Sequence, residues 1–374
     1  MSAPDETLDL SIQEAQQSHE RSFVSSEIET QVDYICRNRN RSGIRFMLAC
    51  LLAKIQQPDI DIRKPYTEIP GDDSYSGRTY DERYIGIFAL KHELPCNTTT
   101  AFLTPAWRNI NQTLATDMTI EGSPRKLYQT ILILLDDIQS HKITSNNLLK
   151  EILRYLILIR DERQQRLTSL LKELNTDTDL ILSSEQIIRI MEQHLQQPRS
   201  SRLPVLMIAA IYQTLDAYLP QDMLDLQAHN AADTQTRAIG DLEIILPDEK
   251  RTVTAYEMKT RPVSREDIDI ALRKIAQSGK RLDNYIFITT ESISEDIVTY
   301  AASLYTKSGT EFVLLNCIEF TRYFLHLFHW LRLDFLNHYQ RLVLSEPGSG
   351  VNPALKEVLL VLRHTAELSL NADD

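Results

Sequence analysis

The segment GDLEIILPDEKRTVTAYEMK, residues 240–259, sets the topology that we predict for this chain. Residues 242–246 are apolar and rich in β-branched side chains, which favours a strand. The polar residues 247–250 predict a turn, and residues 252–259 predict the strand that returns from it. The segment therefore predicts an antiparallel hairpin.

Three polar side chains are expected to meet at the open end of this hairpin. Asp241 begins one strand, whereas Glu257 and Lys259 end the other and point to one face because they are two residues apart. Two carboxylates, helped by the backbone carbonyl of Met258, supply oxygen ligands of the kind that Mg²⁺ prefers. A lysine beside the metal can orient its water and offset charge on a phosphate. The hairpin thus predicts a metal-dependent phosphodiesterase site.

Chance is a simpler explanation for the spacing of Asp241, Glu257 and Lys259, because 25% of the residues are charged and exposed hairpins often carry such charges. The elements that follow favour the site. The segment 264–267 resembles a capping box that opens a helix to about residue 278, where Gly279 ends it. Residues 284–290 and 311–317 predict buried strands, with a helix over 294–307 between them. The predicted order is hairpin, helix, strand, helix, strand.

This order, with Asp241 and Glu257-Met258-Lys259 in place, resembles the core of the PD-(D/E)XK nucleases. Within that group the chain is most similar to type II restriction endonucleases of the SacI family. The likeness covers roughly residues 40–345 and is weaker in the first half, where it rests on residues 78–83. Gly240 stands where the family pattern has proline. The resemblance implies that Asp241 and Glu257 bind the metal and that Lys259 orients water and stabilises charge.

Length and composition describe a soluble globular protein. The 374 residues suffice for one large domain or two ordinary ones, with 43% hydrophobic residues for their cores. Residues 1–25 lack the apolar core of a signal peptide and predict a disordered or loosely ordered N-terminus. The longest apolar run, 205–212, is too short to span a bilayer. The four scattered cysteines lack metal-site spacing, which favours reduced thiols and a cytoplasmic protein.

The formal net charge of −12 argues against a large surface for non-specific nucleic-acid binding, since Lys and Arg carry phosphate contacts. A locally basic cleft remains compatible with it, and an acidic exterior would suppress binding to other DNA.

The loop 94–109 interleaves hydroxyl and amide side chains with Phe102 and Trp107. Such residues read base edges or wedge between bases; alternatively, the loop packs on the core through its two aromatics. The polar segment 229–237 either reaches DNA or only connects two elements. The residues that we predict to contact DNA are Arg78, Arg83, Thr98, Thr99, Thr100, Arg108, Asn109, Gln235 and Arg237.

Much of the remaining chain is predicted to be helical. Helices are expected over 124–140, 145–173, 184–197 and 203–218, followed late in the chain by an aromatic helix over 320–339. In that helix His326 and His329 lack an acidic partner at ligand spacing, so an aromatic face that closes a core or a dimer contact is favoured over a metal site.

The predicted fold class is α/β, a PD-(D/E)XK restriction-endonuclease-like core of mixed sheet flanked by helices, with a mainly helical N-terminal region. The predicted parts are 1–25, the helical region 26–200, the nuclease core 201–345, and a linker and helix over 346–374. The predicted activity is Mg²⁺-dependent double-strand cleavage of DNA at a short sequence by a homodimer. A cognate DNA methyltransferase would share that sequence. The alternatives are a structure-selective repair or recombination nuclease and a non-enzymatic helical interaction protein.

Overall fold

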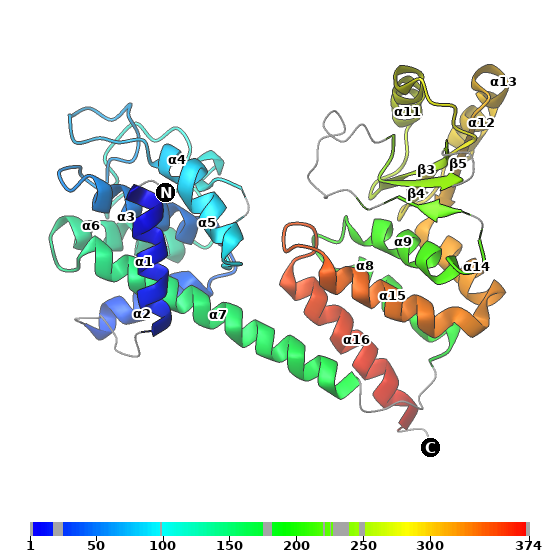
Figure 1. Ribbon diagram of the computed structural model, residues 1–374. Coiled ribbons are helices and arrows are strands. Elements are labelled where there is room, and N and C mark those ends of the chain that lie inside the picture. The colour runs from blue at the N-terminus through cyan, green and yellow to red at the C-terminus, as the bar shows by residue number, and fades with distance from the viewer. Residues whose placement is uncertain are drawn as a thin grey trace. The chain divides into compact units, whose positions relative to one another are not determined.

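The computed structural model describes residues 3–17, 25–97, 99–174, 182–219, 221–224, 226, 239–246 and 251–371. The chain forms two compact units, residues 1–165 and 166–374 (Figure 1). None of the helices in these described ranges is long and apolar enough to cross a lipid bilayer.

The first unit consists of helices joined by loops, with no strand among its described residues. It contains α1 (Ala3–Gln17), α2 (Ser26–Arg37), α3 (Ser42–Gln56), α4 (Gly77–Tyr80), the π-helical turn η1 (Asp81–Ile85), α5 (Gly86–Lys91), the 3-10 turn η2 (Ala101–Leu103), α6 (Arg125–Gln139) and most of α7 (Ser145–Leu174). Helix α3 is its centre, because the consecutive residues 42–53 are all buried. Such a helix must be packed on every side.

The N-terminus differs from the prediction of a disordered or loosely ordered segment to residue 25. Residues Ala3–Gln17 form helix α1, which contacts α3. Leu8, Ile12 and Ala15 recur at helical spacing and are buried. This short apolar stripe is sufficient to hold an otherwise polar segment on the core.

The second unit contains a mixed sheet whose strands follow the chain order: β1 (Asp222–Met223), β2 (Leu242–Leu246), β3 (Arg251–Lys259), β4 (Asn284–Thr289) and β5 (Glu311–Asn316). The β1–β2 and β2–β3 pairs are antiparallel, and the β3–β4 and β4–β5 pairs are parallel. The predicted hairpin and the predicted order of elements are therefore confirmed. The predicted turn over 247–250 lies outside the described residues.

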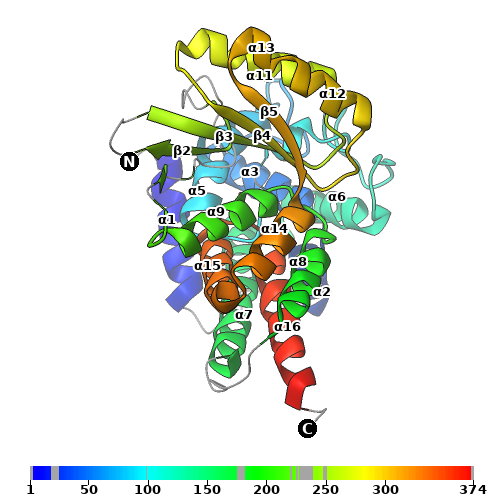
Figure 2. The same ribbon diagram turned by 90° about the vertical axis from the view of Figure 1, so that its right-hand side faces the viewer.

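Helices cover both faces of this sheet (Figure 2). On one face, α11 (Arg265–Ser278) and α12 (Glu295–Ser303) bury a core that includes Ala255 and Phe287. On the other face, α9 (Leu203–Leu215) and α14 (Cys317–Leu327) pack with Leu242 and Ile288. The short α13 (Tyr305–Ser308) leads from α12 to β5. The architecture is thus α/β with a mixed five-stranded sheet.

The boundary of this unit differs from the predicted core, 201–345. Helices α8 (Ser184–Leu195) and α16 (Pro353–Asn371) contact each other, and α8 also contacts α14. The buried His194 of α8 forms hydrogen bonds with Tyr339 Oη at 2.9 Å and the Leu355 carbonyl at 3.0 Å. Burial lowers the pKa of His194 to about 4, so the imidazole is neutral at pH 7. These contacts place both helices in the core beneath the sheet.

The aromatic segment 320–339, predicted as one helix, is broken. Helix α14 ends at Leu327, Phe328 leaves helical geometry, and the 3-10 turn η3 (His329–Leu331) leads into α15 (Arg332–Ser345). The break allows Phe324 of α14 and Phe335 of α15 to meet in one core, with ring centroids 5.7 Å apart.

Candidate active site

Gly240 brings the start of β2 against the backbone of β3. A Cβ atom at this position would lie 2.5 Å from the Tyr256 carbonyl oxygen, closer than real Cβ contacts allow. The next residue, Asp241, donates its N–H to that same oxygen at 2.7 Å. Proline, which carries a Cβ, would meet the same obstruction. Glycine at this position therefore permits the close approach.

The carboxylate of Asp241 lies at the end of the hairpin. Its Oδ2 accepts the N–H of Met258 at 2.7 Å. Burial and then the negative charge of Glu257 raise the pKa of Asp241, although Met258 and Lys259 oppose the shift. The N–H and C=O of a strand residue point to the same neighbouring strand, so the Met258 carbonyl is also directed to the side of Asp241.

Glu257 accepts two hydrogen bonds and has a second lysine nearby. Lys259 Nζ is 2.8 Å from Oε1, and the Tyr285 hydroxyl and Lys274 Nζ lie 3.1 Å and 3.8 Å from Oε2. Tyr285, on β4, also reaches the Ile239 carbonyl at 3.2 Å. Its hydroxyl thus connects Glu257 with the residues that precede Asp241.

A second carboxylate, that of Asp267, lies near the Lys259 ammonium group. Asp267 Oδ1 lies 3.9 Å from Lys259 Nζ and accepts from Arg261 at 2.6 Å. Asp267 also forms the reciprocal capping box of α11 with Ser264. Burial would raise the pKa of Asp267, but hydrogen bonds from Arg261 and Ser264 lower it to about 2. Asp267 is therefore ionised at neutral pH.

Glu243 is a further buried carboxylate of the hairpin. It accepts the N–H of Ile239 at 2.7 Å and the hydroxyl of Thr252 at 3.0 Å, and Lys280 Nζ lies 3.6 Å away. These bonds hold Glu243 against the residues that precede Asp241. Because its lone pairs are engaged within the hairpin, Glu243 is a structural residue.

Comparison with known families identifies this part of the chain. Residues 179–290 match the model of the SacI restriction endonuclease C-terminal domain. This segment is therefore similar to that domain, and we call it the SacI-type domain. The resemblance to the SacI family that we noted in the sequence is confirmed. The matched residues include strands β1 to β4 and helix α11. No curated protein matches the chain.

The SacI-type domain supplies oxygen ligands suited to Mg²⁺. Burial raises the pKa of Asp241, and repulsion by the neighbouring carboxylate of Glu257 adds to the shift. A divalent cation would remove that repulsion. No group of three His, Cys, Asp or Glu side chains within the described ranges is arranged to hold a metal. The candidate set is therefore two carboxylates and the Met258 carbonyl, which suffices for an ion that retains several waters.

Most of the residues predicted to contact DNA precede the SacI-type domain in sequence; Gln235 and Arg237 fall within it. Arg78, Arg83, Thr99, Arg108 and Asn109 are exposed in the helical unit. The predicted residues Thr98, Gln235 and Arg237 lie outside the described residues.

Two of the predicted DNA contacts already have partners within the helical unit. The guanidinium of Arg78 lies 2.7 Å from Glu82, and the Thr100 hydroxyl donates to the buried Asp81 at 2.5 Å. Asp81 also forms an ion pair with Arg45 at 2.5 Å. Thr100 is thus part of the network that fixes its loop.

The aromatic side chains of the 94–109 loop belong to the core. Trp107 is fully buried and stacks on Phe46 with centroids 3.9 Å apart, and Phe102 packs beside it at 4.9 Å from Phe46. The interpretation that these rings wedge between DNA bases is wrong. The alternative, a threonine-rich turn that packs on the core by its aromatics, is confirmed.

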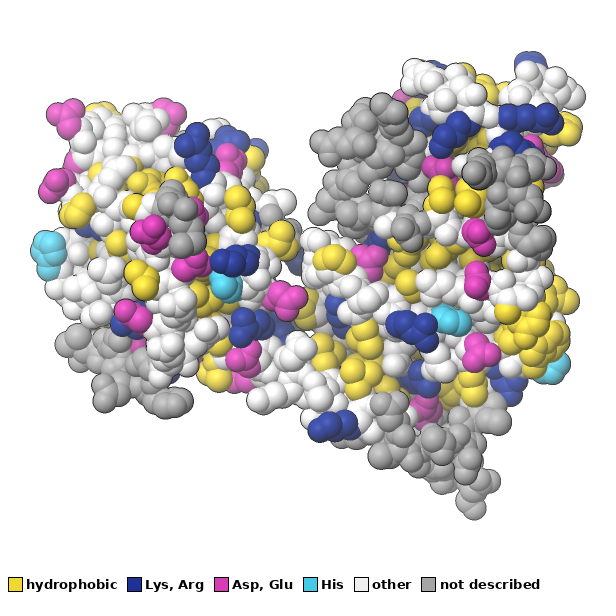
Figure 3. Space-filling view, in the orientation of Figure 1, with side chains coloured by type: hydrophobic (Ala, Val, Ile, Leu, Met, Phe, Trp, Pro, Cys, Tyr) yellow, Lys and Arg dark blue, Asp and Glu magenta, His cyan; other side chains and the backbone are white. Residues whose placement is uncertain are grey.

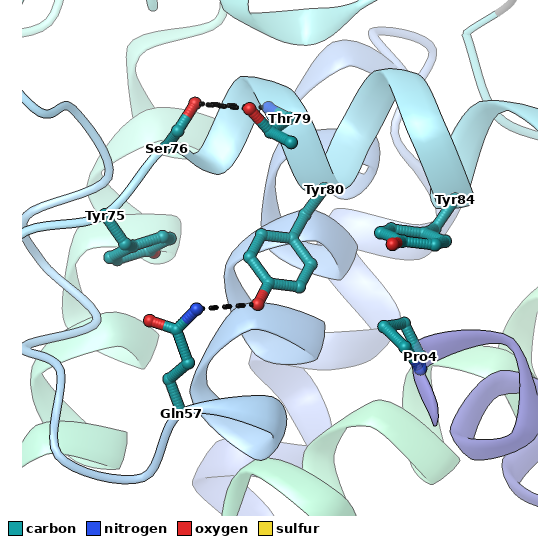
Figure 4. A pocket seen from close by; sticks show the side chains of 7 residues that line it. All are labelled: Pro4, Gln57, Tyr75, Ser76, Thr79, Tyr80 and Tyr84. Atoms are coloured by element: carbon teal, nitrogen blue, oxygen red, sulfur yellow. Dashed lines mark hydrogen bonds between the residues drawn. The ribbon is translucent and has the colours of Figure 1, made fainter. Parts of the chain in front are cut away.

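A pocket of about 270 Å³ opens in the helical unit (Figure 4). Gln57 donates to the hydroxyl of Tyr80 at 3.0 Å across it. Its lining residues are Pro4, Gln57, Tyr75, Ser76, Thr79, Tyr80 and Tyr84. All of them precede the residues that match the SacI-type domain.

Sequence reasoning identified three charged residues of the site but missed Tyr285, Lys274 and Glu243. A weak signal existed for Tyr285, because a tyrosine in a buried strand needs a partner for its hydroxyl. Lys274 carried no signal, since its neighbour Glu257 is 17 positions away and the contact depends on how α11 packs on the sheet.

Proposed function

We propose that the chain is a type II restriction endonuclease that hydrolyses DNA phosphodiester bonds with Mg²⁺ and cuts both strands at a short sequence. One observation carries the proposal: Asp241, Glu257 and Lys259 lie together at the end of one hairpin inside a restriction endonuclease domain.

The chemistry assigns a role to each of these residues. Mg²⁺ held there would acidify a bound water and polarise the phosphate. Asp241 and Glu257 would hold the ion, with the Met258 carbonyl beside them. Lys259 would orient the attacking water. In the reaction a bond forms between the water oxygen and phosphorus, one phosphorus–oxygen ester bond breaks, and the leaving sugar oxygen takes up a proton.

The proposed enzyme acts as a homodimer. Two-fold protein symmetry matches the two-fold symmetry of a palindromic site, so two copies would cut the two strands. A cognate methyltransferase would protect the same sequence in the host without contacting this chain.

The test is Mg²⁺-dependent digestion of a sequenced plasmid by the full-length protein, followed by mapping of the fragment ends. We expect discrete bands for the wild type. Asp241→Asn and Glu257→Gln are expected to lower the cleavage rate at least about 100-fold, because each removes a charge that holds the ion. Glu311→Gln, an exposed acid on β5, is the matched control and should cut like the wild type.

Other outcomes separate the rival functions. Degradation without discrete bands would identify a structure-selective repair or recombination nuclease. An absence of cleavage by well-folded wild-type protein over a range of DNA sequences and Mg²⁺ concentrations would overturn the nuclease proposal and favour a non-enzymatic interaction protein.

A further inference from the structure

The hydroxyl of Tyr285 contacts both segments that carry the proposed metal ligands. Its Oη lies 3.1 Å from Glu257 Oε2 and 3.2 Å from the carbonyl oxygen of Ile239. Ile239 precedes Asp241 by two residues on the approach to β2. One side chain of β4 therefore connects the Glu257 carboxylate with the backbone that leads to Asp241.

The phenol ring is held firmly in this position. Tyr285 is fully buried, and its ring packs against those of Phe287 and Phe312 with centroids 5.1 Å and 5.7 Å away. Its partner on β3 in the parallel ladder is Ala255, which shares its core and lies two residues before Glu257. Residues two apart on a strand point to the same face. The register therefore places the ring on the face of the sheet that carries Glu257.

A neutral donor differs from the lysines near Glu257 in its response to a metal ion. Lys259 Nζ, 2.8 Å from Oε1, and Lys274 Nζ, 3.8 Å from Oε2, are cations, so a divalent ion on the same carboxylate would repel both. Asp267 Oδ1, 3.9 Å from Lys259 Nζ, is a second anion for that lysine. The phenol of Tyr285 is uncharged at neutral pH, and a carboxylate has about four lone pairs. Its hydrogen bond is therefore compatible with a cation bound to Glu257.

We propose that Tyr285 is a positioning residue for the metal site. Its hydroxyl holds the Glu257 carboxylate, and through Ile239 the approach to Asp241, in the arrangement that binds one divalent cation. Removal of a hydrogen-bond partner from a ligating carboxylate commonly lowers metal affinity about 10- to 100-fold. The inference predicts a change in metal affinity rather than in the chemical step, because the hydroxyl contacts the ligands and not the reacting atoms. It rests on the proposed nuclease function.

Tyr285→Phe tests the proposal, because it removes the hydroxyl and keeps the packed ring. Mn²⁺ binding to the full-length protein is measured without DNA, from the electron paramagnetic resonance signal of the free ion. Single-turnover cleavage is measured as a function of Mg²⁺ concentration. We expect Mn²⁺ to bind about 10-fold more weakly and the half-saturating Mg²⁺ concentration to rise by a similar factor. The cleavage rate at saturating Mg²⁺ should stay within about three-fold of the wild type.

Tyr212→Phe is the matched control. Tyr212 of α9 forms a hydrogen bond with the Tyr256 hydroxyl at 2.9 Å, within the core on the other face of the sheet. This variant also loses one tyrosine hydroxyl, but it should bind Mn²⁺ and cleave DNA like the wild type.

Replacement of Tyr285 by 4-aminophenylalanine is the rescue variant. Its amine is a neutral donor on a ring of the same size, so it should restore most of the Mn²⁺ affinity. It also tests the proposal if Tyr285→Phe does not fold. A folded amine variant that bound Mn²⁺ about 10-fold more weakly than the wild type would overturn the inference.

A hydroxyl that only stabilised the fold would give a different result. Tyr285→Phe would then melt at a lower temperature without metal, while its Mn²⁺ affinity and half-saturating Mg²⁺ concentration equalled those of the wild type. That result, with an active wild type, overturns this inference alone. A wild-type protein that neither binds Mn²⁺ nor cleaves DNA overturns the nuclease function and this inference together.

Discussion

Glu257 is the residue around which the site is built. It receives a lysine from its own strand, a tyrosine from β4 and a lysine from α11. Asp241, by contrast, is fixed by the backbone of β3 through the N–H of Met258. The two proposed metal ligands are therefore positioned by different means, one by side chains and the other by the close approach of two strands.

The close approach of Gly240 to the Tyr256 carbonyl predicts that one added methyl group at Gly240 will disturb the site. Gly240→Ala would place a Cβ atom 2.5 Å from the Tyr256 carbonyl oxygen, so the start of β2 must move away from β3. We expect a loss of about 1–3 kcal/mol in the free energy of unfolding and a larger loss of cleavage rate, because Asp241 moves with the backbone. Urea unfolding and single-turnover cleavage measure the two effects.

Gly348→Ala is the control for this substitution. No heavy atom of the described residues lies within 4 Å of a Cβ built at Gly348. This variant should match the wild type in both measurements. A Gly240→Ala protein that also matched the wild type would contradict the close packing of β2 on β3.

At the scale of elements, helix α11 combines three functions. Its buried face completes the core above the sheet, its N-terminus is capped by Ser264 and Asp267, and one flank brings charged groups to the end of β3. Helix α11 thus connects the stability of the domain to the geometry of the site.

Because Asp267 caps α11 as a carboxylate, we expect its contribution to the stability of the fold to depend on pH. A carboxyl group whose pKa is lowered to about 2 in the folded state stabilises the fold above its unfolded pKa of about 4. This stabilisation is lost as the pH falls through the folded value. We expect Asp267→Asn to cost about 1–2 kcal/mol at pH 7, since the cap and the Arg261 pair are both weakened.

Hydrogen exchange of the α11 amides, followed by mass spectrometry, measures this effect locally. Protection should fall in Asp267→Asn at pH 7. In parallel urea unfolding, the difference from the wild type should narrow between about pH 4 and pH 2. Asp296→Asn, an exposed acid in the first turn of α12, should change protection little. Equal effects of the two substitutions would contradict the role of the cap.

At the scale of the whole molecule, the chain is acidic overall, while its site gathers lysine and arginine side chains beside the carboxylates. The net charge is −12, yet Lys259, Arg261, Lys274 and Lys280 accompany the end of the hairpin and α11. Figure 3 shows Lys and Arg side chains gathered over the end of the second unit that carries α11 and α12. Such a distribution favours phosphate binding at one place and weak binding elsewhere.

The proposed function predicts the mass of the active assembly. On a short duplex that contains the mapped cleavage sequence, the protein should sediment with twice the 43.1 kDa of the chain plus one DNA duplex. A scrambled duplex of the same length is the control and should bind weakly. A monomer on the cognate duplex that still cuts both strands at once would contradict the homodimer.

The sequence by itself determined the hairpin, the order of the elements after it and the three charged residues at its end. These features depend on local periodicity, turn residues and spacing along one strand pair, which short segments carry. Only the tertiary structure decided that Lys274, Tyr285 and Glu243 surround the hairpin, that Trp107 is core, and that α8 and α16 pack beneath the sheet. Those contacts depend on strand register and helix packing, which bring together residues that no local pattern relates.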